Sequence, residues 1–192
     1  MKKPRNCPWP GADPLMIAYH NAEWGKPLYD DRKLFEFLIL EGMQAGLSWR
    51  TVLHKRENFR AAFDGFDPDK IVRYGRNKKT LLMKDAGIIR NRLKIEAAVQ
   101  NAMAFLNLRE KRQSFSRTLW QFTDGKPIVN YWKKMKEIPA TTGVSDAMSL
   151  SLKEKGFRFV GSTICYAHMQ ATGMVNDHLV SCFRHAECRR AV

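Results

Sequence analysis

Residues 153–177 read KEKGFRFVGSTICYAHMQATGMVND, and this stretch decides the fold. Gly156 and Gly161 bound a short turn with a helical pattern before and after it. The sequence therefore predicts a helix, a hairpin turn and a second helix. Such a turn exposes backbone N–H groups beside the start of a helix, where they can bind a phosphate oxygen. Ordinary packing of two helices around a loop would give the same pattern, so the motif alone leaves both interpretations open.

Helical patterns continue outward from this stretch. Ser145 or Asp146 is expected to cap the helix that ends near Gly156. The run over 31–45 is apolar on nearly every face, which predicts a buried helix. No segment alternates apolar and polar residues for long enough to build a sheet, so we predict an all-α fold in a single domain over 1–192. The other predicted segments are the helix-hairpin-helix over 145–178 and helices over about 48–63, 78–85, 88–106 and 114–122.

The composition narrows the class of partner. The chain has 192 residues, with 33 Lys and Arg against 19 Asp and Glu and a formal net charge of +14. This excess favours polyanions, either nucleic acid or an anionic membrane surface, although a generally basic and soluble protein would show the same charge. No apolar run reaches roughly 18 residues, which excludes a membrane-spanning helix. The basic first residues are followed by Pro and Gly rather than by the apolar core of a secretory signal. We therefore expect a cytoplasmic protein whose four cysteines are thiols or metal ligands.

Two groups of residues could carry chemistry. Glu41 interrupts an apolar helix, and a carboxylate there loses its hydration and needs a cation or strong hydrogen-bond donors. It could form a buried ion pair with an internal Arg or Lys, or it could recognise a ligand. His178 and Cys182 have the i, i+4 spacing that places two side chains on one face of a helix, where a metal could bind. Scattered Cys and His are common, so this spacing alone leaves the metal site open.

Five spaced motifs give the chain a specific resemblance. Residues 157–161 (FRFVG) resemble the LPGVG hairpin of the helix-hairpin-helix DNA glycosylases, and residues 175–179 (VNDHL) resemble the VDTHV run that follows it. Residues 35–49 resemble the opening helices of that superfamily, and residues 85–92 a shorter second hairpin. Within the superfamily the chain resembles the DNA-3-methyladenine glycosylase I family over nearly its whole length, through DPLMIAYHNAEWG, LEGMQAGLSW, DAGIIRNRLKI, GFRFVGSTICY and VNDH.

The resemblance implies a base-excision DNA repair enzyme. Such an enzyme flips 3-methyladenine out of alkylated double-stranded DNA and hydrolyses its N-glycosidic bond, which leaves an abasic site. In the family pattern Tyr19 and Glu41 bond the flipped base and Trp49 stacks on it, so these three residues would form the base pocket. Glu41 is the catalytic candidate. Trp9 and Trp24 are further pocket candidates that could also simply pack the N-terminal lobe.

The same resemblance implies a structural zinc site with four ligands: Cys7, His20, His178 and Cys182. Four protein ligands leave no open coordination position. The zinc would therefore clamp an irregular N-terminal lobe, residues 1–29, to the last part of the chain, residues 175–188. The expected architecture is a helix-hairpin-helix DNA glycosylase fold with a zinc-clamped N-terminal lobe.

Two positions depart from the superfamily. Asn176 stands where the wider superfamily has its catalytic Asp, and Thr163 stands where bifunctional members carry a Schiff-base Lys. A hydroxyl cannot form an imine with the deoxyribose C1′, so we expect a monofunctional glycosylase without lyase activity. N3-methylation makes adenine a better leaving group, because the base departs neutral from a cationic state. This fits the absence of an Asp at position 176.

Basic residues beside the two hairpins are expected to contact DNA phosphates, and such contacts position an enzyme without reading sequence. The basic candidates are Lys78, Lys79, Arg90 and Arg92. Gly161 is a candidate through the backbone N–H groups of the first hairpin. We expect a monomer that acts on duplex DNA and does not bind membranes. Two other functions stay open. One is a DNA-binding module that has lost catalysis, and the other is an RNA-binding zinc protein, for which we find no aromatic recognition motif on a sheet.

Overall fold

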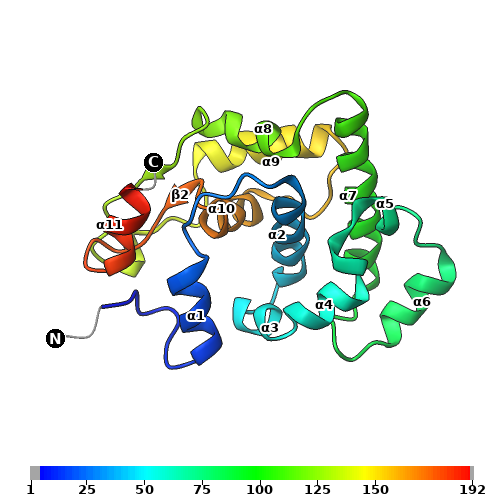
Figure 1. Ribbon diagram of the computed structural model, residues 1–192, viewed down its shortest axis with the longest axis horizontal. Coiled ribbons are helices and arrows are strands. Elements are labelled where there is room, and N and C mark those ends of the chain that lie inside the picture. Colours follow the sequence, from blue (N-terminus) through cyan, green and yellow to red (C-terminus); the bar gives the residue numbers. More distant parts are fainter. Residues whose placement is uncertain (1–4, 191–192) are drawn as a thin grey trace.

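The computed structural model describes residues 5–190 and is mostly helical (Figure 1). None of the described helices is both long and apolar enough to cross a membrane. The α-helices are α1 (Pro14–Ala22), α2 (Asp31–Gln44), α3 (Trp49–His54), α4 (Arg56–Ala62), α5 (Pro68–Ile71), α6 (Arg76–Lys84), α7 (Arg92–Glu110), α8 (Phe115–Trp120), α9 (Gly143–Glu154), α10 (Ser162–Ala171) and α11 (Phe183–Arg190). Three 3₁₀ turns are η1 (Asp64–Phe66), η2 (Gln121–Thr123) and η3 (Met135–Glu137).

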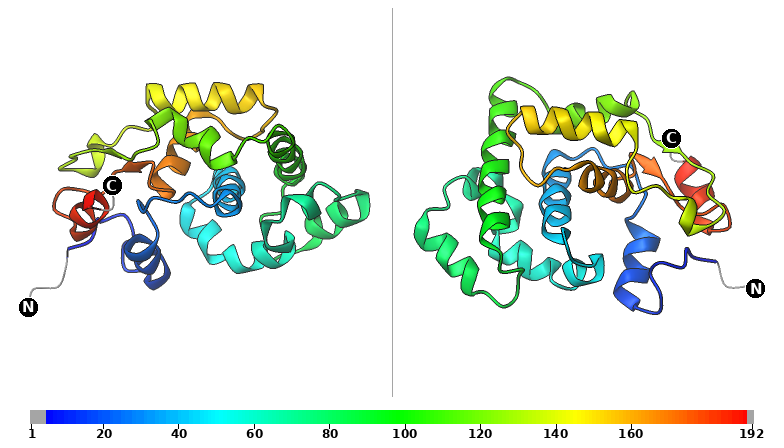
Figure 2. Two further views of the ribbon diagram at one scale, coloured as in Figure 1. Left: turned by 45° about the horizontal axis from the view of Figure 1, so that its top comes forward. Right: turned by 180° about the vertical axis from the view of Figure 1, so that it is seen from behind.

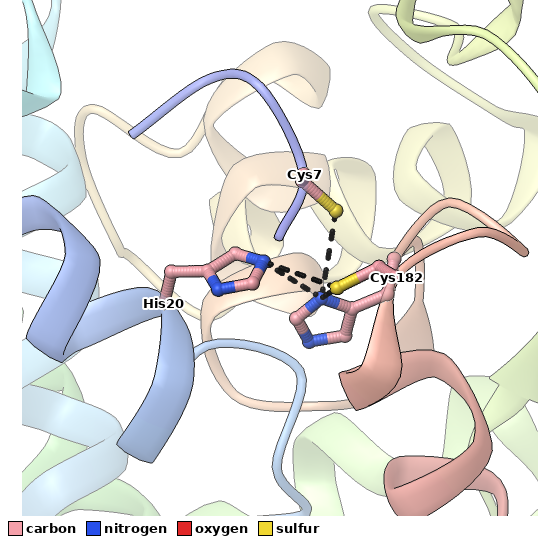
Figure 3. Close-up of side chains that lie close together, drawn as sticks. Cys7, His20 and Cys182 are labelled. Carbon is pink, nitrogen blue, oxygen red and sulfur yellow. Dashed lines mark hydrogen bonds between the residues drawn. The ribbon is translucent and has the colours of Figure 1, made fainter. Parts of the chain in front are cut away.

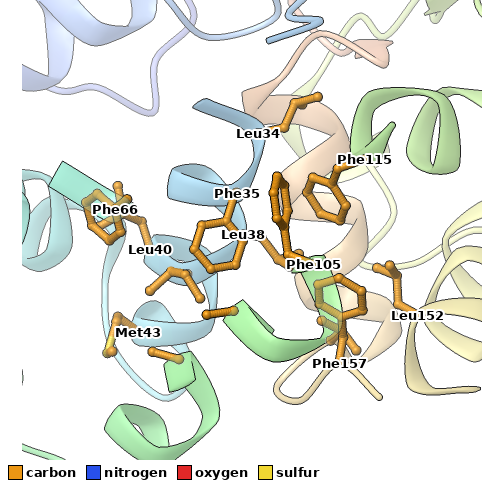
Figure 4. Packing of buried hydrophobic residues seen from close by; sticks show 14 of the residues in the cluster. Leu34, Phe35, Leu38, Leu40, Met43, Phe66, Phe105, Phe115, Leu152 and Phe157 are labelled. Atoms are coloured by element: carbon orange, nitrogen blue, oxygen red, sulfur yellow. The ribbon is translucent and has the colours of Figure 1, made fainter. Parts of the chain in front are cut away.

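The helix α2 forms the centre of the core. Every residue from Leu34 to Met43 is buried, as the apolar run predicts, because α2 contacts α3, α7, α8 and α10. Aromatic side chains from α7, α8 and the hairpin meet α2 in one cluster, in which the rings of Phe35 and Phe105 are 5.2 Å apart (Figure 4). Full burial of one such side chain contributes about 1.5–3 kcal/mol. This packing fixes the position of α2. It therefore also fixes the position of Glu41, the one acidic residue in the C-terminal half of the helix.

The predicted helix-hairpin-helix is formed by α9 and α10. Gly156 has φ +90° and ends α9, and the Phe157 N–H donates to the Leu152 carbonyl (3.0 Å), as in a Schellman motif. The Asn101 side chain on α7 clamps the turn through bonds to the backbone N–H (2.6 Å) and C=O (3.1 Å) of Arg158. Gly161 is the N-cap of α10 and offers no side chain to the free N–H groups of its first turn.

Several predicted boundaries were wrong. Thr142, not Ser145 or Asp146, caps α9, and Ser145 is its capping-box partner. The pattern over 48–63 splits at Lys55, whose backbone leaves helical geometry while its ammonium donates to the Ala86 carbonyl (2.8 Å). The prediction of an all-α fold missed two short strands, which pair in parallel: β1 (Ile128–Val129) and β2 (Val175–Asn176).

The two ends of the described chain lie together at one side of the molecule, opposite α6 (Figures 1 and 2). The N-terminal segment was expected to be irregular, but it contains α1, which starts at Pro14 behind the N-cap Asp13. The Phe183 N–H donates to the Arg5 carbonyl (3.1 Å). Cys7 and Cys182 are buried together in a small apolar cluster separate from the main core.

Candidate active site and metal centre

A cavity of about 200 Å³ opens between the N-terminal segment, α2, α3 and α10. It is smaller than the roughly 300–1,000 Å³ typical of sites for drug-sized ligands, so it suits a single ring system. Its lining residues are Trp9, Tyr19, Trp24, Glu41, Gln44, Trp49, Met135, Ile138, Ala167 and Gln170. The structure therefore brings together all three predicted base-binding residues, and it adds both tryptophans that could have served packing alone.

Glu41 is the distinctive group of this cavity. Its residue is 3% exposed, and its Oε2 atom has no hydrogen-bond partner. Desolvation by burial raises its pKa from 4.5 to about 8. Among residues 5–190 no Lys or Arg forms an ion pair with it, so the alternative of a buried ion pair is not supported. The cavity therefore presents a carboxyl group that no protein group in the described chain pairs with.

Aromatic side chains form the walls around this carboxyl group. The rings of Tyr19 and Trp49 lie 5.3 Å apart at 44°, and those of Trp9 and Trp24 lie 5.1 Å apart at 63°. The indole Nε1 atoms of Trp9 and Trp49 are buried without an acceptor. Burial and then the charge of Glu41 raise the pKa of Tyr19, which keeps it a neutral hydrogen-bond donor. A flat, polar and preferably cationic ring matches these walls.

A larger groove of about 620 Å³ lies on the other side of Tyr19. Its carboxylates are already paired, since Glu23 bonds Arg56 (2.7 Å) and Glu57 bonds Arg60 (2.6 Å). None of the unpartnered buried polar atoms found in the described chain belongs to its lining. The smaller cavity is therefore the better candidate for a binding site.

One further group beside the cavity was not predicted from the sequence. Gln170 lines the cavity from α10, and its amide Nε2 donates to Asp177 (2.8 Å). Asp177 is 1% exposed and directly precedes His178 in the sequence. A polar residue at helical spacing from an apolar wall residue such as Ala167 was the only signal available.

The four predicted metal ligands converge. Their ligand atoms all lie within 4.8 Å of one another, and all four residues are buried. Figure 3 shows Cys7, His20 and Cys182 close together, on three separate segments of the chain. Cys182 Sγ is 3.6 Å from His20 Nε2 and 3.7 Å from His178 Nδ1, and the two nitrogens are 3.2 Å apart. Cys7 Sγ is 3.7 Å from the same His178 atom. This group could hold a metal ion.

The surroundings of the two histidines favour metal binding. The other ring nitrogen of His178 lies 2.9 Å from the Trp24 carbonyl, and that of His20 lies 2.7 Å from Asn21 Oδ1. Each acceptor holds the proton on the outer nitrogen and leaves the inner nitrogen free to coordinate. The spacing of His178 and Cys182 predicted that both lie on one helix, which was wrong. They lie in the turn before α11.

The two departures from the superfamily lie outside the cavity lining. Asn176 is buried and bonded at both ends of its amide, to the His185 carbonyl (3.0 Å) and the His178 N–H (3.3 Å). It is therefore a scaffold residue. Thr163 is exposed at the start of α10, and no lysine is found among the lining residues.

The basic side chains predicted to contact phosphates differ in whether they already form ion pairs within the protein. Lys78 pairs with Asp64 (3.6 Å) and lies over the Tyr74 ring, and Arg92 lies 3.9 Å from Glu96. Within the described range Arg90 and Lys79 form no ion pair, and Arg90 is exposed in the second hairpin.

Comparison with known proteins gives consistent matches. The model of the methyladenine glycosylase family matches residues 9–185. DNA-3-methyladenine glycosylase 1 of Escherichia coli (strain K12) is 51% identical over 92% of this chain and 94% of its own. DNA-3-methyladenine glycosylase of Haemophilus influenzae is 49% identical over 92% of this chain and 95% of its own.

Solved structures agree with the sequence matches. A crystal structure of a 3-methyladenine DNA glycosylase I is 50% identical with a TM-score of 0.92, over 93% of this chain and 98% of that one. The 3-methyladenine DNA glycosylase I from Staphylococcus aureus, solved to explain 3-methyladenine recognition, is 34% identical with a TM-score of 0.89, over 93% of this chain and 95% of that one.

Proposed function

The chain belongs to the methyladenine glycosylase family, and on that basis we propose that it excises 3-methyladenine from alkylated duplex DNA. Water replaces the base at C1′ of the deoxyribose, the N-glycosidic bond breaks, and an abasic site and the free base result. The single observation that carries the proposal is the buried, unpaired Glu41 inside an aromatic cavity.

Glu41 is proposed to bind the flipped base. Adenine carries an N6 amino group that can donate hydrogen bonds, and 3-methyladenine is cationic while it is attached to the sugar. The cavity has a buried carboxyl group, and no Lys or Arg is found among its lining residues in the described part of the chain, so a cationic base would supply the missing countercharge. An unmodified adenine is neutral and lacks this attraction.

Tyr19 and Trp49 are proposed to complete the pocket. Flipping a nucleotide out of the duplex costs a few kcal/mol of stacking and pairing. Stacking on an aromatic side chain returns about 1–3 kcal/mol per base, and the Trp49 face also attracts a cationic ring. The Tyr19 hydroxyl, kept neutral by burial, adds a hydrogen-bond donor beside Glu41.

The Cys/His group is proposed to be a structural Cys₂His₂ zinc site. Tetrahedral zinc with Zn–S bonds of about 2.3 Å and Zn–N bonds of about 2.0–2.1 Å places its ligand atoms about 3.3–3.8 Å apart. The separations of 3.2, 3.6 and 3.7 Å between ligand atoms fit this arrangement. Four protein ligands leave no place for a reacting water, so the ion would hold the N-terminal lobe, with Trp9 and Tyr19, against the rest of the pocket.

Phosphate contacts are proposed for the two hairpins. The uncapped first turn of α10 after Gly161 offers free N–H groups, and exposed Arg90 lies in the second hairpin. Lys79 and Arg92 are proposed to contact further phosphates of the DNA backbone. Lys78 could do so only after its ion pair with Asp64 is broken. A monomeric state and a cytoplasmic location stay predictions.

Release of free base from methylated duplex DNA, resolved by chromatography, tests the function. We expect 3-methyladenine to be released and the strand to stay intact until alkali is added. A protein that binds duplex DNA but releases no base would instead be the non-catalytic module.

A further inference from the structure

Asp177 is a buried carboxylate held entirely by neutral groups. Its Oδ1 accepts from Asn130 Nδ2 and Trp132 Nε1, both at 2.7 Å. Its Oδ2 accepts from Tyr166 Oη at 2.7 Å and Gln170 Nε2 at 2.8 Å. No ion pair to it occurs among residues 5–190. The base-binding roles proposed above, for Glu41, Tyr19 and Trp49, involve none of these five residues.

The two carboxylate oxygens of Asp177 accept all four of these bonds and donate none. The four donors around Asp177 therefore all have to point their hydrogens at it. For the Gln170 amide this decides its orientation. The opposite orientation would bring Oε1 against Oδ2 of Asp177, and two acceptors would face each other at hydrogen-bond distance.

Gln170 is also a wall residue of the cavity that holds Glu41. The one side-chain hydrogen bond that Gln170 forms within the described chain uses Nε2 and goes to Asp177, so the carbonyl Oε1 is left available as an acceptor. The wall beside Glu41 thus offers a hydrogen-bond acceptor whose identity is set by a neighbour outside the cavity.

We propose that Gln170 is a specificity-determining residue that reads position 6 of the flipped purine, and that Asp177 is the positioning residue that fixes its amide. The inference rests on the proposed function. Adenine presents an amino donor at position 6, whereas guanine presents an oxygen acceptor there. An acceptor at Gln170 Oε1 attracts the first and repels the second, so N3-methylated adenine is favoured over N3-methylated guanine.

A purely structural role for Asp177 makes a different prediction. Asn130 and Trp132 begin the segment that leads to Met135 and Ile138 on the cavity wall, so Asp177 also ties this segment to α10. Loosening that tie would slow the excision of every base by a similar factor. The ratio of excision rates for the two bases therefore separates the roles.

The first test replaces Gln170 by Met, which has a similar size and no amide. Single-turnover excision is measured at enzyme excess on duplexes that carry 3-methyladenine or 3-methylguanine. We expect the adenine-to-guanine rate ratio to fall about tenfold, the value of one hydrogen bond of about 1.4 kcal/mol. Gln113→Met, at an exposed position outside the cavity, is the matched control and should keep the wild-type ratio.

The second test replaces Asp177 by Asn, whose NH₂ can donate to a flipped Gln170 amide. Position 6 then meets a donor, so the ratio should fall at least as far as in Gln170→Met. In the double variant the ratio should fall no further than in Gln170→Met alone, because Asp177 acts through Gln170. Asp31→Asn is the control, since Asp31 likewise accepts several bonds, at the start of α8.

An unchanged ratio in Gln170→Met would overturn the inference, whether or not Asp177→Asn folds. If Asp177→Asn slows excision of both bases by the same factor, or if the rate ratio falls further in the double variant than in Gln170→Met, Asp177 has only a structural role. Metal content and melting temperature are measured on the same samples, because Asp177 precedes a metal-ligand candidate. If the wild-type protein releases neither base, the proposed function fails instead.

Discussion

Replacing Glu41 by Gln keeps the size of the side chain and removes its ability to carry charge. A hydrogen bond that involves a charged group contributes about 1.5–3 kcal/mol. The loss of this bond to the flipped base should slow excision about tenfold to a hundredfold. Glu41→Ala should lose at least as much, because the cavity wall also loses packing.

The same variant should change how stability depends on pH. The folded protein holds the Glu41 proton up to about pH 8, whereas the unfolded chain releases it near 4.5. The folded state therefore binds more protons in this interval, and wild-type stability falls as the pH rises through it. At about 1.4 kcal/mol per pH unit, this loss approaches 5 kcal/mol. Glu41→Gln lacks this loss, so its melting temperature should gain on the wild type from pH 5 to pH 8.

Excision should show the opposite trend. Below about pH 8 the empty pocket holds Glu41 as a neutral acid, so kcat/KM of the wild type should rise toward pH 8 if the carboxylate binds the cationic base. Glu41→Gln should lose this rise. Single-turnover excision and thermal unfolding are measured on the same samples. Lowered stability at every pH with unchanged excision per folded molecule would show that Glu41 belongs to the scaffold.

Three further predictions concern the metal, the chemistry and the DNA contacts. Purified protein should contain about one zinc per chain, and Cys182→Ala should lower metal content and melting temperature together; folded, active protein without zinc would refute the site. Borohydride should trap no covalent enzyme–DNA adduct, because Thr163 cannot form an imine, and a strong adduct would show lyase chemistry. Affinity for undamaged duplex should fall steeply with salt, and Arg90→Gln or Arg92→Gln should each reduce the slope of log K against log salt by about one; a salt-independent affinity would exclude the phosphate contacts.

The sequence predicted the long elements well and their ends poorly. The helix α2 could be predicted because it is apolar on every face, which only a buried helix tolerates. The start of α9 was misplaced because Thr142 and Ser145 form one capping box, and either hydroxyl fits the N-cap pattern. The helix α1 was missed although Asp13 and Pro14 are a good start signal, since the Pro, Gly and Trp around it suggested irregular chain.

The site could be predicted only where its residues carry a recognisable pattern. Glu41 stands out because a carboxylate among apolar residues is costly. The four metal-ligand candidates could be predicted only through the family resemblance, because scattered Cys and His are common. The contact between Asp177 and Gln170 could not be predicted, because the donors that hold Asp177 are neutral and common side chains spread from Asn130 to Gln170. The hydrogen bonds around Asp177 form only when β1, β2 and α10 have packed together.

The convergence of Cys7 and His178, which lie 171 positions apart, has a consequence for biosynthesis. The ribosome makes Cys7 171 residues before His178, so the Cys/His cluster cannot close until His178 and Cys182 have also been made. Closing so long a loop costs on the order of 5 kcal/mol in chain entropy, and a prefolded core reduces that cost by bringing the ends close. A chain that stops before His178 lacks two of the four residues and could not close this cluster, although Tyr19 could still pack against Phe37 and Trp49.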